Sequence, residues 1–225
     1  MLRALLSRSN LAHRLHGWLL GSRFHITGSG HRIERHHARL ERTRIEVVGR
    51  DCVVLLGPGA RLWDCSITVA GRGATLRIGA GCRLRRARLA VEDDGSCLEI
   101  GNGTSMTGPT LVAHEGGTVR LGRDCMVAQY AELRNSDSHG IYDGATGARL
   151  NPAADVLIGD HVWIGLGAFV FKGARIGDGA IIAARSLVTG PVPPACIVAG
   201  MPPRVLRENV AWRRERTAAS ILSPQ

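Results

Sequence analysis

The chain has 225 residues, 44% of them hydrophobic and only 4% aromatic, with 29 glycines and a formal net charge of +10. This hydrophobic content excludes a disordered chain, and few aromatics with many glycines favour short strands and tight turns over a core of large rings. The charge indicates either a solubilising surface or attraction to polyanions, among them nucleic acids, anionic lipids and acidic glycans. The six cysteines show no paired spacing, which favours buried thiols in a reducing compartment, so we expect a cytoplasmic protein.

Residues 1–25 are predicted to form a basic helical segment. The apolar run from Trp18 to Leu20 lies between the basic residues Arg14 and Arg23 and is too short to span a membrane. No small-residue cleavage site follows it, which disfavours a signal peptide. We expect this segment to cap the end of the domain; peripheral contact with the inner membrane face is the alternative.

From about residue 26 the sequence repeats at an interval of about 22 residues. The stretches LGPGARL (56–62), IGAGCRL (78–84) and IGNGTSM (100–106) each pair an aliphatic residue with glycine at the same place. A period of this length is typical of a solenoid, in which each repeat is one coil of short strands and corners. Glycine suits corners where φ is positive.

Residues 134–157 form a polar insertion that interrupts the repeat. Long loops inside regular solenoids usually carry function. After the insertion the period shortens to six residues, with one aliphatic column and one column of smaller residues four positions later. The aliphatic column is Ile158, Ile164, Val170, Ile176, Ile182 and Val188. The smaller residues are Val162, Ala168, Ala174, Ala180 and Ser186.

This organisation predicts an all-β fold, a single-stranded parallel β-helix over residues 26–200, with short helices at both ends. Three six-residue units bring the chain back over itself, so the aliphatic residues stack in ladders and the small residues fill the interior. Residues 201–225 are predicted to hold a C-terminal helix and tail, with the helix from Arg204 to Glu215 packing through Val205, Leu206 and Trp212.

The C-terminal half resembles the hexapeptide-repeat acyltransferases. The segment from IGDHVWIG to VAGMPPRVLRE (158–208) is similar to the last coils of maltose, galactoside and xenobiotic acetyltransferases. The insertion SDSHGIYD followed by ARLNP is most similar to bacterial capsule and O-antigen polysaccharide O-acetyltransferases. The resemblance is strong over about residues 98–212.

The resemblance implies a left-handed β-helix, a homotrimer with active sites in the clefts between subunits, and acetyl-CoA lying along the C-terminal coils. It implies transfer of an acetyl group to a hydroxyl of a sugar or polysaccharide of a capsule, lipopolysaccharide or exopolysaccharide. The carbohydrate acceptors that fit the basic charge include acidic and lipid-linked ones. A metal ion is not expected.

His139 matches the catalytic histidine of this family. Imidazole is well suited to remove the proton of an attacking hydroxyl, because its pKa lies near the working pH. Asp137 or Asp143 could orient His139, or both could only serve turns of the loop. Asn135 and Tyr142 are candidates for facing the acceptor. No cysteine or serine stands out as a nucleophile, so direct attack on the thioester is expected.

The acetyl-CoA site is predicted from matched positions on the last coils. Trp163 lies between two ladder positions and should point outward, where it would wall the acetyl end of the site or pack in the trimer. Leu166 is expected near the thioester, and Gly190 replaces a lysine found in several relatives. The other cofactor positions implied by the resemblance are Ala168, Ala184, Thr189, Arg204 and Arg207.

Four alternatives remain open. A small acceptor, such as an oligosaccharide, xenobiotic or nucleotide-sugar, would use the same chemistry. A trimeric β-solenoid scaffold would have the fold without chemistry. A carbonic anhydrase of the γ kind would need His114, His139 and His161 to converge on a metal ion, without the expected HxxxxH pair. Nucleic-acid binding is disfavoured because no basic motif is interleaved with aromatic residues.

Overall fold

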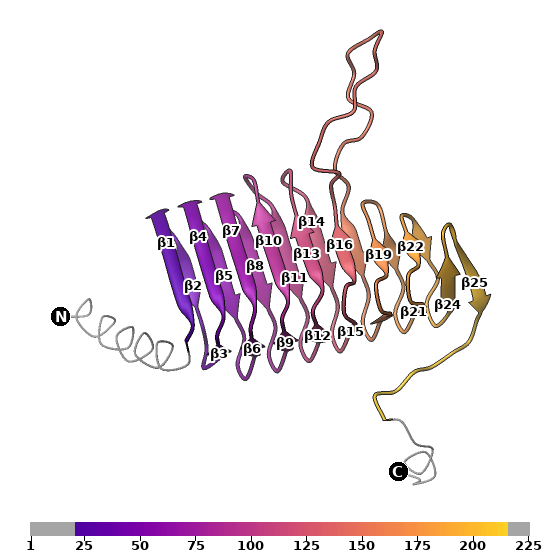
Figure 1. Ribbon diagram of the computed structural model, residues 1–225, viewed down its shortest axis with the longest axis horizontal. Helices are drawn as coiled ribbons and strands as arrows, with labels where there is room; N and C mark the ends of the chain where they lie inside the picture. Colours follow the sequence, from indigo (N-terminus) through magenta and orange to yellow (C-terminus); the bar gives the residue numbers. More distant parts are fainter. Residues whose placement is uncertain (1–20, 216–225) are drawn as a thin grey trace, which may run out of the picture.

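The chain forms a parallel β-helix in a computed structural model that describes residues 21–215. Each coil contributes one strand to each of three sheets, which we call A, B and C, in the fixed order A, B, C, and the coils stack along the long axis (Figure 1). Neighbouring coils pair in parallel throughout, and the described residues contain no helix. The structure thus confirms the predicted all-β parallel solenoid.

The strands are short, from two to seven residues. Sheet A holds β1 (Arg23–Ser29), β4 (Arg44–Arg50), β7 (Ser66–Arg72), β10 (Arg88–Glu92), β13 (Thr110–Ala113), β16 (Glu132–Arg134), β19 (Phe169–Val170) and β22 (Leu187–Val188). Sheet B holds β2 (Arg32–Glu34), β5 (Val53–Leu56), β8 (Thr75–Ile78), β11 (Cys97–Ile100), β14 (Thr118–Leu121), β17 (Val156–Ile158), β20 (Arg175–Ile176) and β23 (Pro191–Val192). Sheet C holds β3 (Arg39–Glu41), β6 (Arg61–Trp63), β9 (Arg83–Arg85), β12 (Ser105–Thr107), β15 (Met126–Val127), β18 (Trp163–Ile164), β21 (Ile181–Ile182), β24 (Ile197–Gly200) and β25 (Pro203–Arg207).

The core is built from ladders of identical register inside the three sheets. On sheet A one ladder runs without interruption and every member is fully or almost fully buried. Its members are Ile45, Ile67, Leu89, Leu111, Leu133, Val170 and Val188. The small residues predicted at the corners are also fully buried, from Val162 to Ser186. Burying only one aliphatic side chain per strand suits two-residue strands, because alternate residues face outward.

The coils upstream of the insertion are longer than those downstream. Ser66 pairs with Arg88, 22 residues later, whereas Phe169 pairs with Leu187 after only 18. The extra residues lengthen the sheet A strands and widen the A/B corner. There Gly28, Gly49 and Gly71 stack with φ above +100°, and a Cβ on Gly49 would lie 2.1 Å from the carbonyl oxygen of Gly71. Only glycine allows coils this close.

The predicted helix from Arg204 to Glu215 is wrong. Residues Pro203–Arg207 form β25, which turns back and pairs antiparallel with β24. The last coil of a solenoid leaves the backbone groups of an edge strand unpaired, and a returning strand of the same chain satisfies them. Val205 and Leu206 are exposed, while Trp212 is buried as expected. The predicted N-terminal helix falls largely on residues 1–20, outside the described residues, and β1 already begins at Arg23.

Candidate active site

The polar insertion projects from the A/B corner between β16 and β17, away from the body of the solenoid (Figure 1). Its base is fixed by Asn135, whose side chain is fully buried. The Asn135 amide accepts a hydrogen bond from the His114 N–H (2.8 Å) and donates one to the His114 carbonyl oxygen (2.9 Å). The side chain thus takes the place of backbone groups in the hydrogen-bond ladder where the chain leaves the coil. Because both amide groups are used in these bonds, Asn135 does not face a sugar acceptor here.

The far end of the loop closes on itself. Tyr142 and Arg149 form an isolated antiparallel bridge. The Asp143 carboxylate accepts hydrogen bonds from the backbone N–H of Thr146 (2.6 Å) and of Ala145 (3.0 Å). These bonds, led by that from Thr146, hold the pKa of Asp143 below its ordinary value. Asp143 therefore caps a turn at the tip of the loop, and the Tyr142 side chain is exposed.

Asp137 ties the loop to the neighbouring coil. Its carboxylate pairs with the ammonium of Lys172 at 2.5 Å and accepts a hydrogen bond from the Asn151 amide at 2.7 Å. The Lys172 bond and then the Asn151 bond lower the pKa of Asp137. Sequence reasoning missed this role of Lys172; the available signal was that Lys172 is the single lysine of the chain.

His139 is held by its main chain and not by its ring. The Asn151 amide donates a hydrogen bond to the His139 carbonyl oxygen at 2.8 Å. The His139 side chain is exposed, and its ring makes no hydrogen bond to any residue between 21 and 215. Asp137 and Asp143 are both committed elsewhere within this chain, so neither orients the ring here.

A second polar network beneath the loop was not predicted. The His114 ring lies 3.0 Å from a Glu92 oxygen and 3.4 Å from the Ser138 hydroxyl, next to His139. Glu115 accepts hydrogen bonds from the Arg149 guanidinium and the Ser136 hydroxyl. The Arg149 bond, followed by that from Ser136, lowers the pKa of Glu115 to about 2. The segment that carries His139 is therefore braced from two sides.

The predicted cofactor residues on sheet C and its corner gather on the last coils. Trp163 points outward on β18, in register with Met126 on one side and Ile181 on the other, and is 37% exposed. Leu166 and Ala184 are exposed at the C/A corners of successive coils. These three residues form one continuous surface.

The other predicted cofactor residues lie elsewhere. Ala168 is fully buried, and its carbonyl oxygen and N–H are bonded to Glu132 and Gly165, so its side chain does not reach a surface ligand. Thr189 is exposed at the A/B corner, on the side of the insertion. Arg204 and Arg207 are exposed on β25 at the end of the solenoid.

The structure does not bring His139 and Trp163 together within one chain. The insertion starts at the corner between sheets A and B, whereas Trp163 lies on sheet C and Leu166 at the corner between C and A. His114 shares the A/B corner with the insertion, while His161 lies at the B/C corner, so the three histidines do not converge. Among residues 21–215, no three or more metal-ligating side chains are grouped to hold an ion.

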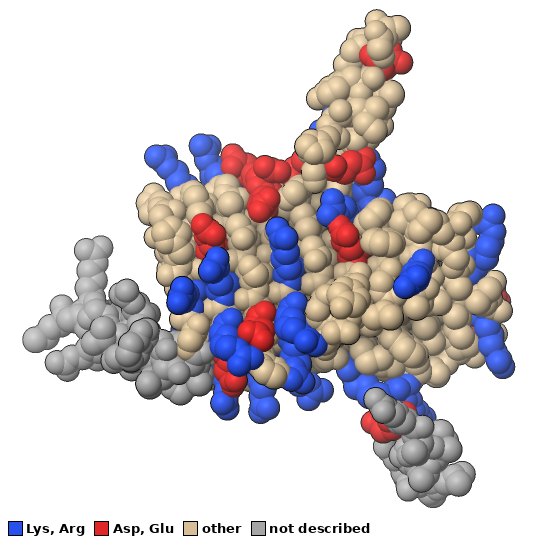
Figure 2. Space-filling model, viewed as in Figure 1, with Lys and Arg blue, Asp and Glu red and all other residues tan. Residues whose placement is uncertain are grey.

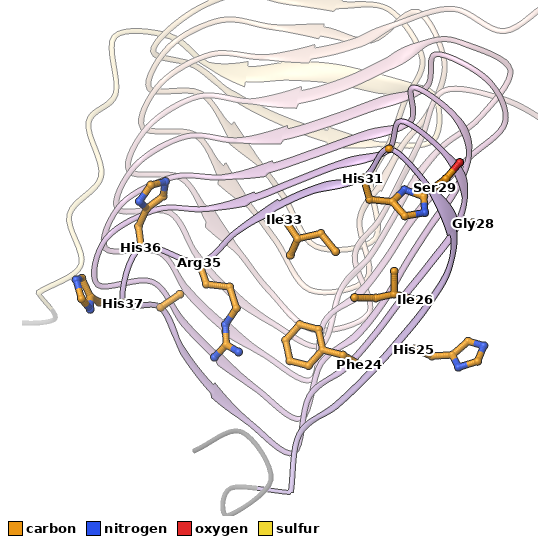
Figure 3. A pocket seen from close by; sticks show the side chains of 12 residues that line it. Phe24, His25, Ile26, Gly28, Ser29, His31, Ile33, Arg35, His36 and His37 are labelled. Carbon is orange, nitrogen blue, oxygen red and sulfur yellow. The ribbon is translucent and has the colours of Figure 1, made fainter. Parts of the chain in front are cut away.

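A cavity of about 950 Å³ opens at the N-terminal end of the described solenoid, against β1 and β2 (Figure 3). Phe24, Ile26 and Ile33 line it, and the Arg35 guanidinium lies 5.0 Å from the centre of the Phe24 ring. None of the predicted site residues lies there. This cavity lies against the first coil of the described residues. Within the described range, no helix is long and apolar enough to cross a membrane.

Comparison with known proteins identifies the relatives of this fold and loop. The chain is 35% identical over 103 residues to the polysialic acid O-acetyltransferase of Escherichia coli O1:K1, which covers 46% of this chain and 34% of that protein. It is 41% identical over 70 residues to the enzyme of the same name from Neisseria meningitidis, covering 31% and 33%. The crystal structure of the polysialic acid O-acetyltransferase OatWY superimposes with a TM-score of 0.83 at 26% identity, covering 88% of this chain and 94% of that one.

The chain is therefore similar in sequence and in fold to polysialic acid O-acetyltransferases. Its solenoid has the left-handed β-helix fold of the OatWY structure. No model of a known protein family matches the sequence. The matched regions span only about a third of the length of the two relatives compared by sequence.

Proposed function

We propose that this protein is an O-acetyltransferase that moves an acetyl group from acetyl-CoA to a hydroxyl of a carbohydrate. The observation that carries the proposal is the presentation of His139. Two networks fix the backbone around it, while its ring makes no hydrogen bond to any residue from 21 to 215. A scaffold has no need to brace a histidine in this way, whereas a general base must reach the proton that it abstracts.

The reaction proceeds by direct attack. The acceptor hydroxyl transfers its proton to the His139 imidazole as its oxygen bonds to the thioester carbonyl carbon, and backbone N–H groups stabilise the oxyanion. The carbon–sulfur bond then breaks, and His139 returns the proton to the leaving thiolate. An acyl-cysteine is not required. Cys125, for example, is fully buried, and desolvation raises its pKa to about 11, so its thiolate is scarce at neutral pH.

Acetyl-CoA binds along the last coils of sheet C in this proposal. Trp163 walls the acetyl and pantetheine end, Leu166 lies by the thioester, and Ala184 contacts the arm. Thr189 lies at the A/B corner, so it would contact an arm that is bound on a neighbouring subunit. Arg204 and Arg207 reach the phosphates, for which a guanidinium fork is suited. Ala168 contributes as a filler of the corner beneath this surface, since its side chain faces the core.

The subunits assemble as trimers with the active sites between them. Support comes from outward apolar side chains on two faces of the last coils. Sheet C presents Met126, Trp163, Ile181 and Ile197 in one column, and sheet A presents Phe169 beside Leu187. A second copy would cover these side chains and bring its own insertion to the Trp163 surface. The reaction takes place in the cytoplasm, where acetyl-CoA is available.

The acceptor is an acidic glycan. Basic side chains gather over the upstream coils, with a few acidic ones between them (Figure 2). Six arginines at or beside the C/A corner there have no carboxylate within 4.0 Å among residues 21–215. We call this surface the arginine face: Arg44, Arg61, Arg83, Arg85, Arg86 and Arg88. Successive strands lie about 4.8 Å apart, so Arg61 and Arg83, which pair directly, form a row that suits a linear polyanion. The similar enzymes are named for polysialic acid, a polymer of this kind.

Release of coenzyme A, followed with a thiol-reactive dye, tests the proposal. Acetyl-CoA is supplied with a panel of acidic and neutral glycans, for the wild type and for His139→Ala. We expect acceptor-dependent release with an acidic glycan, and its loss in the variant. Failure of every acceptor, together with no acetyl-CoA binding by calorimetry, would leave a scaffold as the better account.

A further inference from the structure

The C-terminal segment 208–215, which we call the strap, runs back from β25 across the B/C corners of earlier coils. Val210 N–H donates to the Ala195 carbonyl oxygen at 2.9 Å. Arg214 then donates to the carboxylate of Asp124 at 2.9 Å and to the hydroxyl of Ser105 at 2.6 Å. The strap thus bridges from the last coil to β12, and it is a specific structure rather than a loose tail.

Trp212 is the anchor of the strap. Its ring stacks on the imidazole of His161 with centroids 4.0 Å apart and planes only 5° from parallel, and it is 5% exposed. The indole N–H donates to the His161 carbonyl oxygen at 2.8 Å. Trp212 also lies 6.1 Å from Trp163, at a tilt of 51°, within the range of favourable aromatic pairs. Trp163 therefore has the strap on one side and the open surface of the last coils on the other.

The His161 ring is held at both of its nitrogens. Its Nδ1 lies 2.7 Å from a carboxylate oxygen of Asp124, and its Nε2 lies 3.0 Å from the Trp212 carbonyl oxygen. The ring is therefore fixed between the corner before β15 and the strap that stacks on it.

We propose that the strap is a positioning element of the acetyl-CoA site, in which Trp212, clamped on His161, sets the ring of Trp163. This inference rests on the proposed function. Trp212 acts through Trp163 and is a positioning residue.

The charged groups around His161 are few and come from three segments. Asp124, from the corner before β15, faces the ring directly, and Arg214 of the strap binds the other oxygen of the same carboxylate. Beside them, Asp160 pairs with Arg123 at 2.7 Å. The pKa of Asp124 is lowered although burial opposes this, because hydrogen bonds from His161 and Arg214 outweigh the burial. Asp124 therefore stays ionised at neutral pH as the partner that His161 requires.

Two measurements test the clamp, and the first does not depend on catalysis. Tryptophan fluorescence of the full-length protein is compared between the wild type and His161→Ala, and again between the same two forms in a Trp212→Phe background. We expect His161→Ala to change the spectrum, because it removes the ring stacked on the Trp212 indole, and to have no such effect once Trp212 is phenylalanine. A change of equal size in both backgrounds would overturn the clamp.

The second measurement is the dissociation constant of acetyl-CoA by calorimetry. Trp212→Ala and Arg214→Ala should each weaken binding by about three- to tenfold, as expected for loss of an aromatic contact or of its support. Arg213→Ala is the matched control, because Arg213 is exposed in the same strap.

The outcomes distinguish a failure of the strap proposal from a failure of the proposed acetyltransferase function. If the wild type binds no acetyl-CoA while His161→Ala changes the fluorescence only when Trp212 is present, the proposed function fails and the clamp stands as a structural feature. If the wild type binds acetyl-CoA and Trp212→Ala binds it equally well, the positioning role is wrong although the enzyme assignment holds. A rise in KM for acetyl-CoA in Trp212→Ala that exceeds its loss of kcat supports the role, and Trp212→Phe should restore part of the affinity.

Discussion

At the scale of single residues, the groups that anchor the backbone of His139 are distinct from the imidazole ring that would act in catalysis. The Asn151 amide, Lys172 and Asp137 hold the peptide around it, and the ring makes no hydrogen bond or ion pair with the described part of the chain. A catalytic side chain can therefore be altered here with little effect on folding. Stability and activity should respond to different substitutions in this loop.

His139→Ala is expected to lower kcat by at least about 100-fold, the usual loss when a general base is removed. The melting temperature and the oligomeric state should match the wild type, because the ring supports nothing. Steady-state kinetics with circular dichroism and sedimentation give the three readouts. Near-normal turnover in a folded variant would exclude His139 as the base.

Asp137→Asn removes the partner of Lys172 and should lower kcat by about ten- to hundredfold through misplacement of His139, with little change in melting temperature because the pair is partly exposed. Lys172→Met should have the same effect.

The pKa of Asp137 is lowered in the folded loop. Its contribution is therefore present above its unfolded pKa and lost as the pH falls through the folded value. The loop should therefore stay anchored to the neighbouring coil at neutral pH. A kcat equal to that of the wild type in either variant would contradict this prediction.

At the scale of elements, the insertion falls where coils of 22 residues give way to coils of 18. Before it, strands in sheet A reach seven residues; after it, they have two. The loop departs from the shared corner, and the buried amide of Asn135 completes the ladder in place of backbone. Coil geometry and loop placement thus depend on one side chain.

Asn135→Ala should destabilise the fold by about 2–4 kcal/mol, since it leaves the N–H and carbonyl of His114 without their buried partners. Chemical denaturation measures this. Asn102→Ala is a matched control, because Asn102 is exposed at a corner and accepts one bond from Ala80 at 2.8 Å; its cost should be about 1 kcal/mol or less. Equal costs for the two variants would show that Asn135 does not close the ladder.

The sequence predicted the ladders because an aliphatic residue every six positions has one stable arrangement, three strands per coil. The prediction failed where a contact depends on a strand edge or a side chain that is distant in the sequence. The spacing of Val205, Leu206 and Trp212 suits a helix face. The first part of this segment instead forms strand β25, which pairs with the free edge of β24. The pair of Asp137 and Lys172 joins residues 35 positions apart, which no local pattern reveals. His139 was predictable only from its motif, since its position between sheets A and B depends on the whole coil.

At the scale of the whole molecule, the outer surface divides along the long axis. The column that begins with Arg39, Arg61 and Arg83 on sheet C passes through Ser105 and continues as Met126, Trp163 and Ile181. The upstream coils therefore present basic side chains, which suit an extended anionic polymer. The downstream coils present apolar side chains, which suit a partner subunit and the arm of coenzyme A.

Replacing Arg61 and Arg83 together by alanine should raise KM for an acidic glycan by about tenfold at low salt and reduce its salt dependence, while KM for acetyl-CoA stays constant. The matched control replaces Arg77 and Arg120 of sheet B, both of which pair with Glu99. Kinetics at two ionic strengths give the comparison. An equal effect of both double variants would indicate net charge alone and not the arginine face.

The separation of His139 from Trp163 makes a last prediction about assembly. If each active site joins the insertion of one subunit to the sheet C surface of another, His139→Ala and Trp163→Ala damage different halves of the site. Each variant alone should be nearly inactive. Random trimers of the two, formed by co-expression, contain sites in which an intact loop meets an intact surface, and about one quarter of wild-type activity should return. Co-expression of His139→Ala with a chain that carries both substitutions is the control and should stay inactive. If the mixture of single variants also stays inactive while native mass spectrometry shows mixed trimers, both residues must act within one chain, which the separation of the A/B corner from sheet C opposes.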